Sequence, residues 1–324
     1  MRAPDFWHRD GTLARLLSPL SAVYAWGGAQ KLAGAQPVRA KMPVICVGNI
    51  VAGGAGKTPV VAALVERLKA RGRRPHILTR GYGGTEAGPR AVDPTRHDAT
   101  RVGDEALLLS SVAPTWVARW RPDGAAAAAD MGADILVMDD GFQNGTLVKD
   151  LSLVVIDGGY GFGNRRVIPA GPCREPIATG LARADAVVMV GDDRTGAASL
   201  VGDKPLLRAR LVPGPEAALL HGRDLIAFAG IGRPDKFFDT VEGCGGRIVA
   251  AHSFPDHHPY GRADIEELLE AARAADALAV TTAKDAVRVP EDLRALLTVL
   301  TVRLVWYDTG AVDRLLAPVL DHQS

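Results

Sequence analysis

The sequence contains few cysteines, no long apolar run and almost no net charge. Its three cysteines, Cys46, Cys173 and Cys244, show neither metal-site nor redox-pair spacing, so we expect no disulfides and a reducing, cytoplasmic setting. No run of about 18 apolar residues occurs, so no transmembrane helix is expected. The 324 residues carry a formal net charge of +1, which gives no indication of a nucleic-acid partner.

The N-terminal region is locally basic and has an apolar pattern of its own. Apolar residues recur at helical spacing between residues 13 and 24, which predicts a short amphipathic helix that bends or breaks near Pro19. This helix could pack on the protein core or lie in a membrane surface, and nearby Trp and Arg residues favour the second possibility. Polar residues interrupt the apolar stretch, so no signal peptide is expected. The basic residues of this region are Arg2, Arg9, Arg15, Lys31, Arg39 and Lys41.

The most informative stretch is residues 47–59, where an apolar strand breaks into glycines and ends in Gly-Lys-Thr before a helical pattern. This order is typical of the phosphate-binding loop of P-loop nucleotide enzymes. Glycines allow backbone N–H groups to surround phosphate oxygens, and the start of the helix adds positive partial charge. Lys57 is expected to reach the β- and γ-phosphates, and Thr58 to ligate Mg²⁺. The predicted nucleotide-binding residues are Val51, Ala52, Gly53, Gly54, Ala55, Gly56, Lys57 and Thr58.

One position of this loop departs from the usual pattern, which begins with a glycine where Val51 stands. The alternative is a glycine-rich turn that carries Lys-Thr by coincidence. The strand, the glycines, the Lys-Thr pair and the helix all occur in the right order, so we predict that the chain binds a nucleoside triphosphate.

Apolar strands and helical segments alternate along the chain, which predicts an α/β fold with a P-loop-type parallel sheet covered by helices. A second βα series starts near Leu225, and residues 206–215 are interpreted as a strand and turn at the domain junction. A late strand, 302–307, could pair with it and form a two-stranded ribbon between two lobes, whereas the place of a final helix, 311–320, stays open. The expected strands are 43–48, 75–79, 115–119, 134–139, 152–157, 185–191, 225–230, 247–252 and 278–282, and the expected helices of the first lobe are 57–72, 104–112 and 121–131.

Three domains follow from this pattern. They are an N-terminal membrane-surface segment (1–40), a P-loop domain (41–204) and a smaller α/β lobe that includes the connecting ribbon (205–324).

Two carboxylates, Asp139 and Asp140, directly follow an apolar strand. Ligands of parallel sheets bind at the carboxyl ends of the strands, which is where these side chains emerge. A bare Asp-Asp pair is more often part of a turn. Beside a P-loop, however, it is typical of a Walker-B-type metal site, and this is our prediction.

Other polar residues have several interpretations. Asp104 and Glu105 are typical of a helix start, and the loop Asp256-His257-His258 could bind a metal, act as a base or only form hydrogen bonds. Further polar residues end a strand or lie in a loop rich in Gly, Pro and Arg; they suit a phosphate or sugar substrate but could equally be solvated. The candidate substrate-binding residues of this last group are Arg80, Tyr82, Asn164, Arg165 and Arg174.

Together, these motifs resemble the tetraacyldisaccharide 4′-kinase family of lipid A biosynthesis in Gram-negative bacteria. The family transfers the γ-phosphate of ATP to the 4′-hydroxyl of a tetraacylated glucosamine disaccharide 1-phosphate, at the cytoplasmic face of the inner membrane. The resemblance runs nearly end to end, and the family also lacks the first P-loop glycine. The motifs that carry it are Phe6-Trp7, 48–59, 80–83, 102–105, 139–143, 164–176, 228–232, Asp256-His257 and 282–285.

The resemblance implies roles for particular residues. Asp104 is expected to be the catalytic base, supported by His257 and its neighbour Asp256. ATP and Mg²⁺ are the expected cofactors, held by Lys57 and Thr58 and, for the metal, by Asp139, Asp140 and Glu175. The expected partners are the lipid disaccharide and a membrane surface reached by the N-terminal helix, and no nucleic acid.

A switch ATPase of the membrane-associated partitioning type is the alternative from another class. Such proteins carry a lysine where Ala52 stands, and they do not need an Asp-His-His element in a second lobe. A GTPase is disfavoured because Thr282-Ala283-Lys284-Asp285 has the wrong order for a guanine-reading motif.

Overall fold

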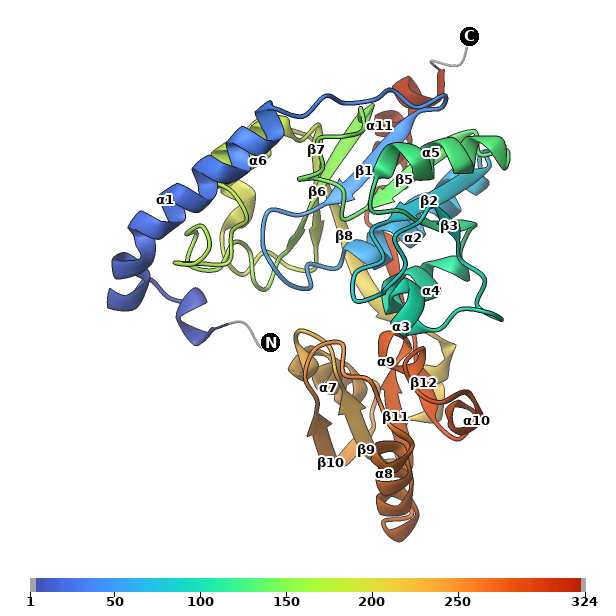
Figure 1. Ribbon diagram of the computed structural model, residues 1–324. Coiled ribbons are helices and arrows are strands. Elements are labelled where there is room, and N and C mark those ends of the chain that lie inside the picture. Colours follow the sequence, from blue (N-terminus) through green and yellow to red (C-terminus); the bar gives the residue numbers. More distant parts are fainter. Residues whose placement is uncertain (1–3, 322–324) are drawn as a thin grey trace.

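Two sheets form the framework of the computed structural model, which describes residues 4–321 (Figure 1). The larger sheet consists of β1 (Val44–Gly48), β2 (Pro75–Thr79), β3 (Arg90–Ala91), β4 (Thr115–Val117), β5 (Ile135–Asp139), β6 (Leu151–Asp157), β7 (Ala186–Val190), β8 (Leu206–Pro213) and β13 (Val302–Trp306). The smaller consists of β9 (Asp224–Ala229), β10 (Arg247–Ser253), β11 (Leu278–Thr282) and β12 (Thr298–Leu300). Their orders are β13-β8-β7-β6-β1-β5-β2-β4-β3 and β10-β9-β11-β12. The predicted α/β fold with a parallel sheet and a second, smaller lobe is confirmed.

Neighbouring strands run parallel throughout, except at the two ends of the larger sheet, where β13 meets β8 and β3 meets β4. The carboxyl ends of the strands in the two sheets face each other (Figure 1). Because ligands of parallel sheets bind at carboxyl ends, the space between the lobes is the natural site for chemistry.

Helices cover both faces of the larger sheet. On one face, an apolar layer joins α2 (Lys57–Lys69) and α11 (Thr309–Asp321) to strand residues such as Ile45 and Val47. On the other face, a second layer joins α5 (Arg121–Asp130) and α6 (Ile177–Arg183) to Val44 and Cys46. Successive residues of β1 therefore point to opposite faces, and both faces are buried. The alanine-rich helix α5 packs so closely on its neighbours that a Cβ at Gly124 would lie 2.5 Å from the Leu78 side chain.

The second lobe is smaller and has its own core around Phe228 and Leu225 of β9. Its helices are α7 (Pro234–Gly243), α8 (Arg262–Ala274), α9 (Ala283–Ala286) and α10 (Glu291–Arg294). In the first lobe, the short helices α3 (Ala99–Val102) and α4 (Asp104–Ser110) face this lobe (Figure 1).

The predicted two-stranded ribbon between the lobes is present, and it is part of the larger sheet. β8 pairs with β13, as expected, but it also pairs with β7, so both strands extend the nine-stranded sheet. The final helix α11 packs on the same sheet through Val312 and Leu316. The predicted division at residue 205 therefore does not follow the sheets, since the smaller sheet lies within residues 214–301.

The N-terminal helix α1 (Thr12–Ala33) is longer than predicted and continues through Pro19. A proline removes one helical hydrogen bond, here to the carbonyl of Arg15, and the helix tolerates this loss. Two small residues of α1, Ala14 and Ser21, are buried against the rest of the protein. Ser21 Oγ also donates to Val167 O at 2.6 Å, which holds the helix in place. Residues 1–3 of the predicted N-terminal segment, including Arg2, lie outside the described residues.

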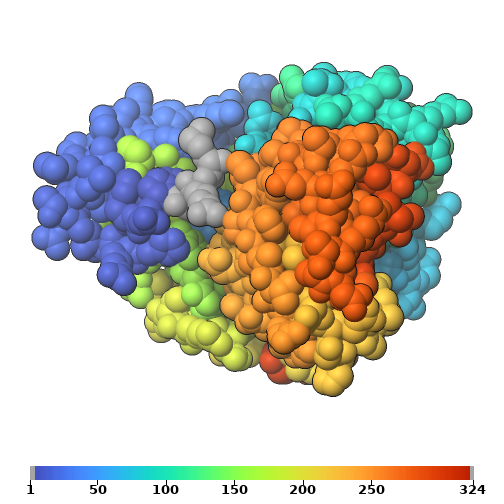
Figure 2. Space-filling model, turned by 90° about the horizontal axis from the view of Figure 1, so that it is seen from below, coloured from blue at the N-terminus to red at the C-terminus, as the bar shows by residue number. Residues whose placement is uncertain are grey.

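Most of the large apolar side chains of α1 are exposed. Leu16 is 72% and Trp26 66% exposed, and Leu13, Leu20, Val23 and Tyr24 are exposed as well. Seen from below, α1 lies at one side of the molecule and the second lobe covers the centre (Figure 2). Within residues 4–321, no helix has the length and apolar character needed to cross a membrane.

Candidate active site

The P-loop lies between β1 and α2, at the edge of the larger sheet that faces the second lobe. β1 pairs with β5 on one side and with β6 on the other. The loop is therefore flanked by the residues that end these two strands, Asp139 and Asp157. The topology thus gathers the predicted phosphate loop, the predicted metal ligand Asp139 and a further carboxylate, Asp157, at one edge.

The backbone of the P-loop has the conformation that its glycines predict. Gly53 and Gly56 have φ of 105° and 81°, in the region that favours glycine. Lys57 begins α2 and donates to Asn49 Oδ1 at 3.3 Å, and its Nζ lies 3.6 Å from Asp140 Oδ1. Lys57 and the start of α2 therefore place positive charge beside the loop, which suits a phosphate chain.

Asp139 and Asp140 are neighbours with contrasting environments. Asp139 is 1% exposed, and neither of its oxygens has a hydrogen-bond partner among the described residues. Burial, with a smaller contribution from the charge of Glu105, raises the pKa of Asp139 to about 8. Burial also opposes ionisation of Asp140, but Lys57 and Arg174 outweigh it and hold the pKa of Asp140 below its ordinary value.

An unpaired buried carboxyl group is costly, so the oxygens of Asp139 suit a cation as their partner. Asp139 and Thr58 therefore fit a magnesium ion that also binds nucleotide phosphates. Within residues 4–321, no three His, Cys, Asp or Glu side chains already form a metal cluster.

Two other predicted residues of this region are already engaged by protein groups. Arg174 donates to Asp140 Oδ1 at 3.0 Å and to Gln143 Oε1 at 3.2 Å. Glu175 accepts from Gln143 at 3.0 Å and from Arg183 at 2.5 Å. Glu175 as a metal ligand and Arg174 as a substrate ligand stay predictions.

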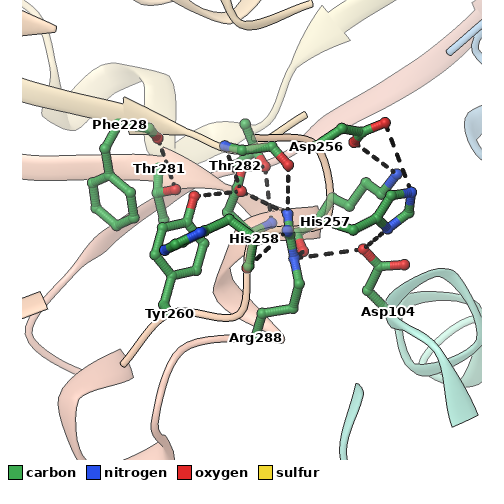
Figure 3. A network of polar contacts seen from close by, with 12 residues as sticks. Asp104, Phe228, Asp256, His257, His258, Tyr260, Thr281, Thr282 and Arg288 are labelled. Atoms are coloured by element: carbon green, nitrogen blue, oxygen red, sulfur yellow. Dashed lines mark hydrogen bonds and ion pairs between the residues drawn. The ribbon is translucent and has the colours of Figure 1, made fainter. Parts of the chain in front are cut away.

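The two lobes meet at Asp104 and His257, which are far apart in sequence (Figure 3). His257 Nδ1 lies 2.8 Å from Asp104 Oδ2, and its Nε2 lies 3.8 Å from Asp256 Oδ2. Asp104 begins α4 and is buried, and its Oδ1 accepts from Glu105 N at 2.8 Å. The structure therefore brings together two residues that the sequence alone presented as separate motifs.

Asp104 is ionised at neutral pH. Burial raises the pKa of Asp104, but the hydrogen bond with His257 and the charges of Lys284 and Arg288 outweigh burial and hold it below the ordinary value. The carboxylate is thus present in its proton-accepting form.

Arg288, whose side chain is almost fully buried, is a residue that the sequence analysis missed. Its Nε lies 3.5 Å from Asp104 Oδ2, and its Nη groups donate to Asp285, to His258 O at 3.0 Å and to Gly230 O at 2.9 Å (Figure 3). Arg288 therefore holds the histidine loop and faces the same carboxylate. No local pattern in the sequence distinguishes it from a surface arginine.

Lys284 is a second missed residue of this contact. It lies 3.3 Å from Glu105 Oε1 and 3.9 Å from Asp256 Oδ1. Its run, Thr282–Asp285, was part of the resemblance to the family and was considered as a guanine-reading motif, but Lys284 itself was given no role. The sequence drew attention to this run, but it did not show that Lys284 forms an ion pair with Glu105 of the other lobe.

The remaining candidates lie in different places. The Tyr82 ring is exposed with its centroid 5.2 Å from that of His257, and Arg80 is exposed at the end of β2. Asn164 donates to Phe6 O and Ala170 O, so it fixes the N-terminal segment. Arg165 lines an apolar pocket beside α6, and its predicted substrate role, like that of Asn164, stays a prediction.

Comparison with known proteins identifies the family. The sequence profile of the family described as tetraacyldisaccharide-1-P 4′-kinase matches residues 13–321. The chain is 63% identical to the tetraacyldisaccharide 4′-kinase of Paramagnetospirillum magneticum over 99% of its own length and 98% of that protein. It is 56% identical to the protein of the same name from Rhodospirillum centenum, over 99% and 97% of the two chains.

A solved structure has the same fold. The crystal structure of LpxK from Aquifex aeolicus, described as an "apo" form in complex with ATP, matches with a TM-score of 0.78 and 24% identity. The match covers 95% of this chain and 99% of the other. The fold, the match to the family profile and the two high-identity relatives agree: the chain belongs to the tetraacyldisaccharide-1-P 4′-kinase family.

Proposed function

We propose that this protein transfers the γ-phosphate of ATP to the 4′-hydroxyl of tetraacyldisaccharide 1-phosphate, a step of lipid A biosynthesis. Membership of the family supports this substrate and this reaction. The observation that carries the mechanism is the contact between Asp104 and His257, because it places an ionised carboxylate at the contact between the two lobes.

The P-loop side of the site binds the nucleotide. The amides of residues 51–56 surround the phosphates, and Lys57 adds a point charge at the β- and γ-phosphates. Thr58, Asp139 and Asp140 would hold Mg²⁺, which neutralises charge on the phosphates when bound. The unpaired oxygens of Asp139 support this assignment.

Asp104 acts as the base in the proposed reaction. It accepts the proton of the 4′-hydroxyl as the sugar oxygen bonds to the γ-phosphorus and the bond from that phosphorus to the leaving ADP oxygen breaks. His257 and Arg288 orient the carboxylate. Phosphoryl transfer depends mostly on positioning and charge neutralisation, so a weak base is sufficient.

Transfer of labelled γ-phosphate from Mg-ATP to tetraacyldisaccharide 1-phosphate in detergent micelles tests this function. We expect label at the 4′ position with the wild type and none with Lys57→Ala. A folded, nucleotide-binding protein that transfers no label would refute the assignment.

The alternative of a partitioning-type switch ATPase is not favoured. The family match covers both lobes, and the contact between Asp104 and His257 has no purpose in a switch that lacks a small substrate.

We further propose that α1 lies in the surface of the inner membrane, at its cytoplasmic face, so that the acyl chains stay in lipid while the sugar reaches the cleft. The exposed apolar residues of α1 support this, because a helix packed only on protein would bury them. Nearby cations such as Arg9, Arg15 and Lys31 add about 1 kcal/mol each near an anionic surface.

Flotation with anionic lipid vesicles tests the membrane proposal. The variant Leu16→Ser/Leu20→Ser/Trp26→Ser removes exposed apolar area but no buried contact, so it should fold normally and bind vesicles less. The matched control Leu219→Ser/Leu296→Ser changes exposed leucines of the second lobe. Equal vesicle binding by the α1 variant and the wild type would contradict the proposal.

A further inference from the structure

The second lobe touches the P-loop itself, at a point that the proposed chemistry does not yet use. The segment between β9 and α7 lies against Gly54, since a Cβ at Gly232 would be 3.8 Å from Gly54 N. The next residue, Arg233, donates from Nη2 to Gly54 O at 3.2 Å. The amides of a P-loop bind phosphate oxygens, so a residue that contacts Gly54 lies near the phosphates of a bound nucleotide.

Asp157 anchors this contact. It ends β6, the neighbour of β1, and its buried carboxylate pairs with both Arg233 and Lys236 of the second lobe. Burial raises the pKa of Asp157, but the charges and hydrogen bonds of these two cations outweigh it and hold the pKa below the ordinary value. One negative charge therefore faces two positive charges, which leaves an excess positive charge beside the P-loop.

The geometry of Arg233 leaves donors available. Its guanidinium lies 5.4 Å from the centre of the Tyr160 ring, which fixes its plane from one side. Within residues 4–321, its hydrogen bonds all use Nη2, so Nε and Nη1 stay free for further acceptors. The helix α7 begins at Pro234, directly after Arg233, and adds the positive end of its dipole at the same place.

We propose that Arg233 is a further catalytic residue, which binds the terminal phosphates of ATP and stabilises the charge that develops on them during transfer. This inference rests on the proposed kinase function. In other phosphoryl-transfer enzymes, an arginine supplied from outside the P-loop has this effect. Within residues 4–321, the ammonium group of Lys236 donates to Asp157 and to no atom of the P-loop, so Lys236 is a second cation of the same cluster that lies outside the proposed phosphate contact.

A purely structural tether between the lobes is the competing explanation. Both explanations predict that Arg233 matters, but only phosphate binding predicts discrimination between nucleotides that differ in the γ-phosphate. Calorimetric titration of the full chain without lipid separates them, with the Mg²⁺ complexes of the β,γ-imido analogue of ATP and of ADP as probes. The variants are Arg233→Met, Arg233→Lys and, as a matched control from the same ion-pair cluster, Lys236→Met.

For Arg233→Met, we expect affinity for the ATP analogue to fall about tenfold more than affinity for ADP. Lys236→Met should leave the ratio of the two affinities unchanged. Arg233→Lys keeps the positive charge and should restore part of the wild-type preference for the ATP analogue over ADP. Such a recovery would show that the loss in Arg233→Met comes from the missing charge and not from a folding defect. An unchanged ratio in Arg233→Met, or an equal change in Lys236→Met, would overturn the inference. A wild type that binds neither nucleotide would instead overturn the proposed function on which it rests.

Discussion

Within residues 4–321, two polar contacts join the lobes, and they differ in charge balance. On the α4 side, the carboxylates of Asp104 and Glu105 face His257, Arg288 and Lys284 of the second lobe. On the β6 side, Asp157 alone faces two cations. The first contact stabilises an ionised carboxylate, which suits a proton acceptor, and the second leaves positive charge, which suits a phosphate. The contrast indicates that proton acceptance and phosphate binding are assigned to different contacts between the lobes.

Asp104→Asn should break the first contact with the largest effect. The amide keeps the shape of the carboxylate but accepts no proton, so kcat for lipid phosphorylation should fall by about 10²–10⁴. Affinity for the Mg²⁺ complex of the ATP analogue should stay near that of the wild type, because Asp104 is not a predicted phosphate ligand. Unchanged turnover would remove Asp104 from the mechanism.

Asp157→Asn should break the second contact, with an effect on stability. The substitution leaves Arg233 and Lys236 facing each other without a counter-charge, which should lower the free energy of unfolding by about 1–3 kcal/mol. Thermal melting against the wild type measures this. If melting does not change, the ion pairs across the β6 side contribute nothing to holding the lobes together.

His257→Gln sharpens the comparison because it tests the charge on Asp104. The hydrogen bond with His257 lowers the pKa of Asp104, so its loss should raise that pKa and move the acid limb of the kcat/KM profile to higher pH. We expect about a tenfold loss of kcat/KM near neutral pH. Profiles from about pH 4 to about pH 8 for both proteins provide the measurement. An acid limb at the same pH would show that His257 has another role.

The same shift has a consequence for stability. Because the pKa of Asp104 is lower in the folded than in the unfolded protein, ionised Asp104 stabilises the fold at pH values above its pKa in the unfolded chain. This stabilisation is lost as the pH falls through its pKa in the folded protein.

Lys236→Met should have the smallest effect of the series. The Lys236 side chain is 51% exposed, so its ion pair with Asp157 is screened by water and contributes roughly 0–1 kcal/mol. Melting should therefore shift less than in Asp157→Asn. A larger loss than in Asp157→Asn would mean that Lys236, and not Arg233, is the main partner of Asp157.

The sequence predicted the fold where the pattern is local. The buried strands of the larger sheet are continuous apolar runs, and the P-loop follows from glycines and Lys57 alone. Local pattern did not settle the end of α1 or the effect of Pro19, because an exposed helix tolerates one lost hydrogen bond.

The site was predicted less completely, because its contacts cross between lobes. Asp104 and Asp256–His257 were separate, ambiguous motifs until the resemblance to a family paired them. Arg288, Arg233 and Lys236 gave no signal, since their partners lie far away in the chain and depend on how the lobes pack. Long-range ion pairs of this kind leave no periodicity in a sequence.

The pairing of β8 with β13 has a consequence for how the molecule is assembled. Pro213 and Val302 are opposite each other in the ladder, and Gly214 N donates to Thr301 O at 2.8 Å. The chain thus leaves the P-loop lobe and returns to it at one point, so residues 214–301 form a single insertion in a hairpin. A short turn in their place would yield a minimal nucleotide-binding unit with an intact sheet, in which the contribution of the inserted lobe could be measured by its removal.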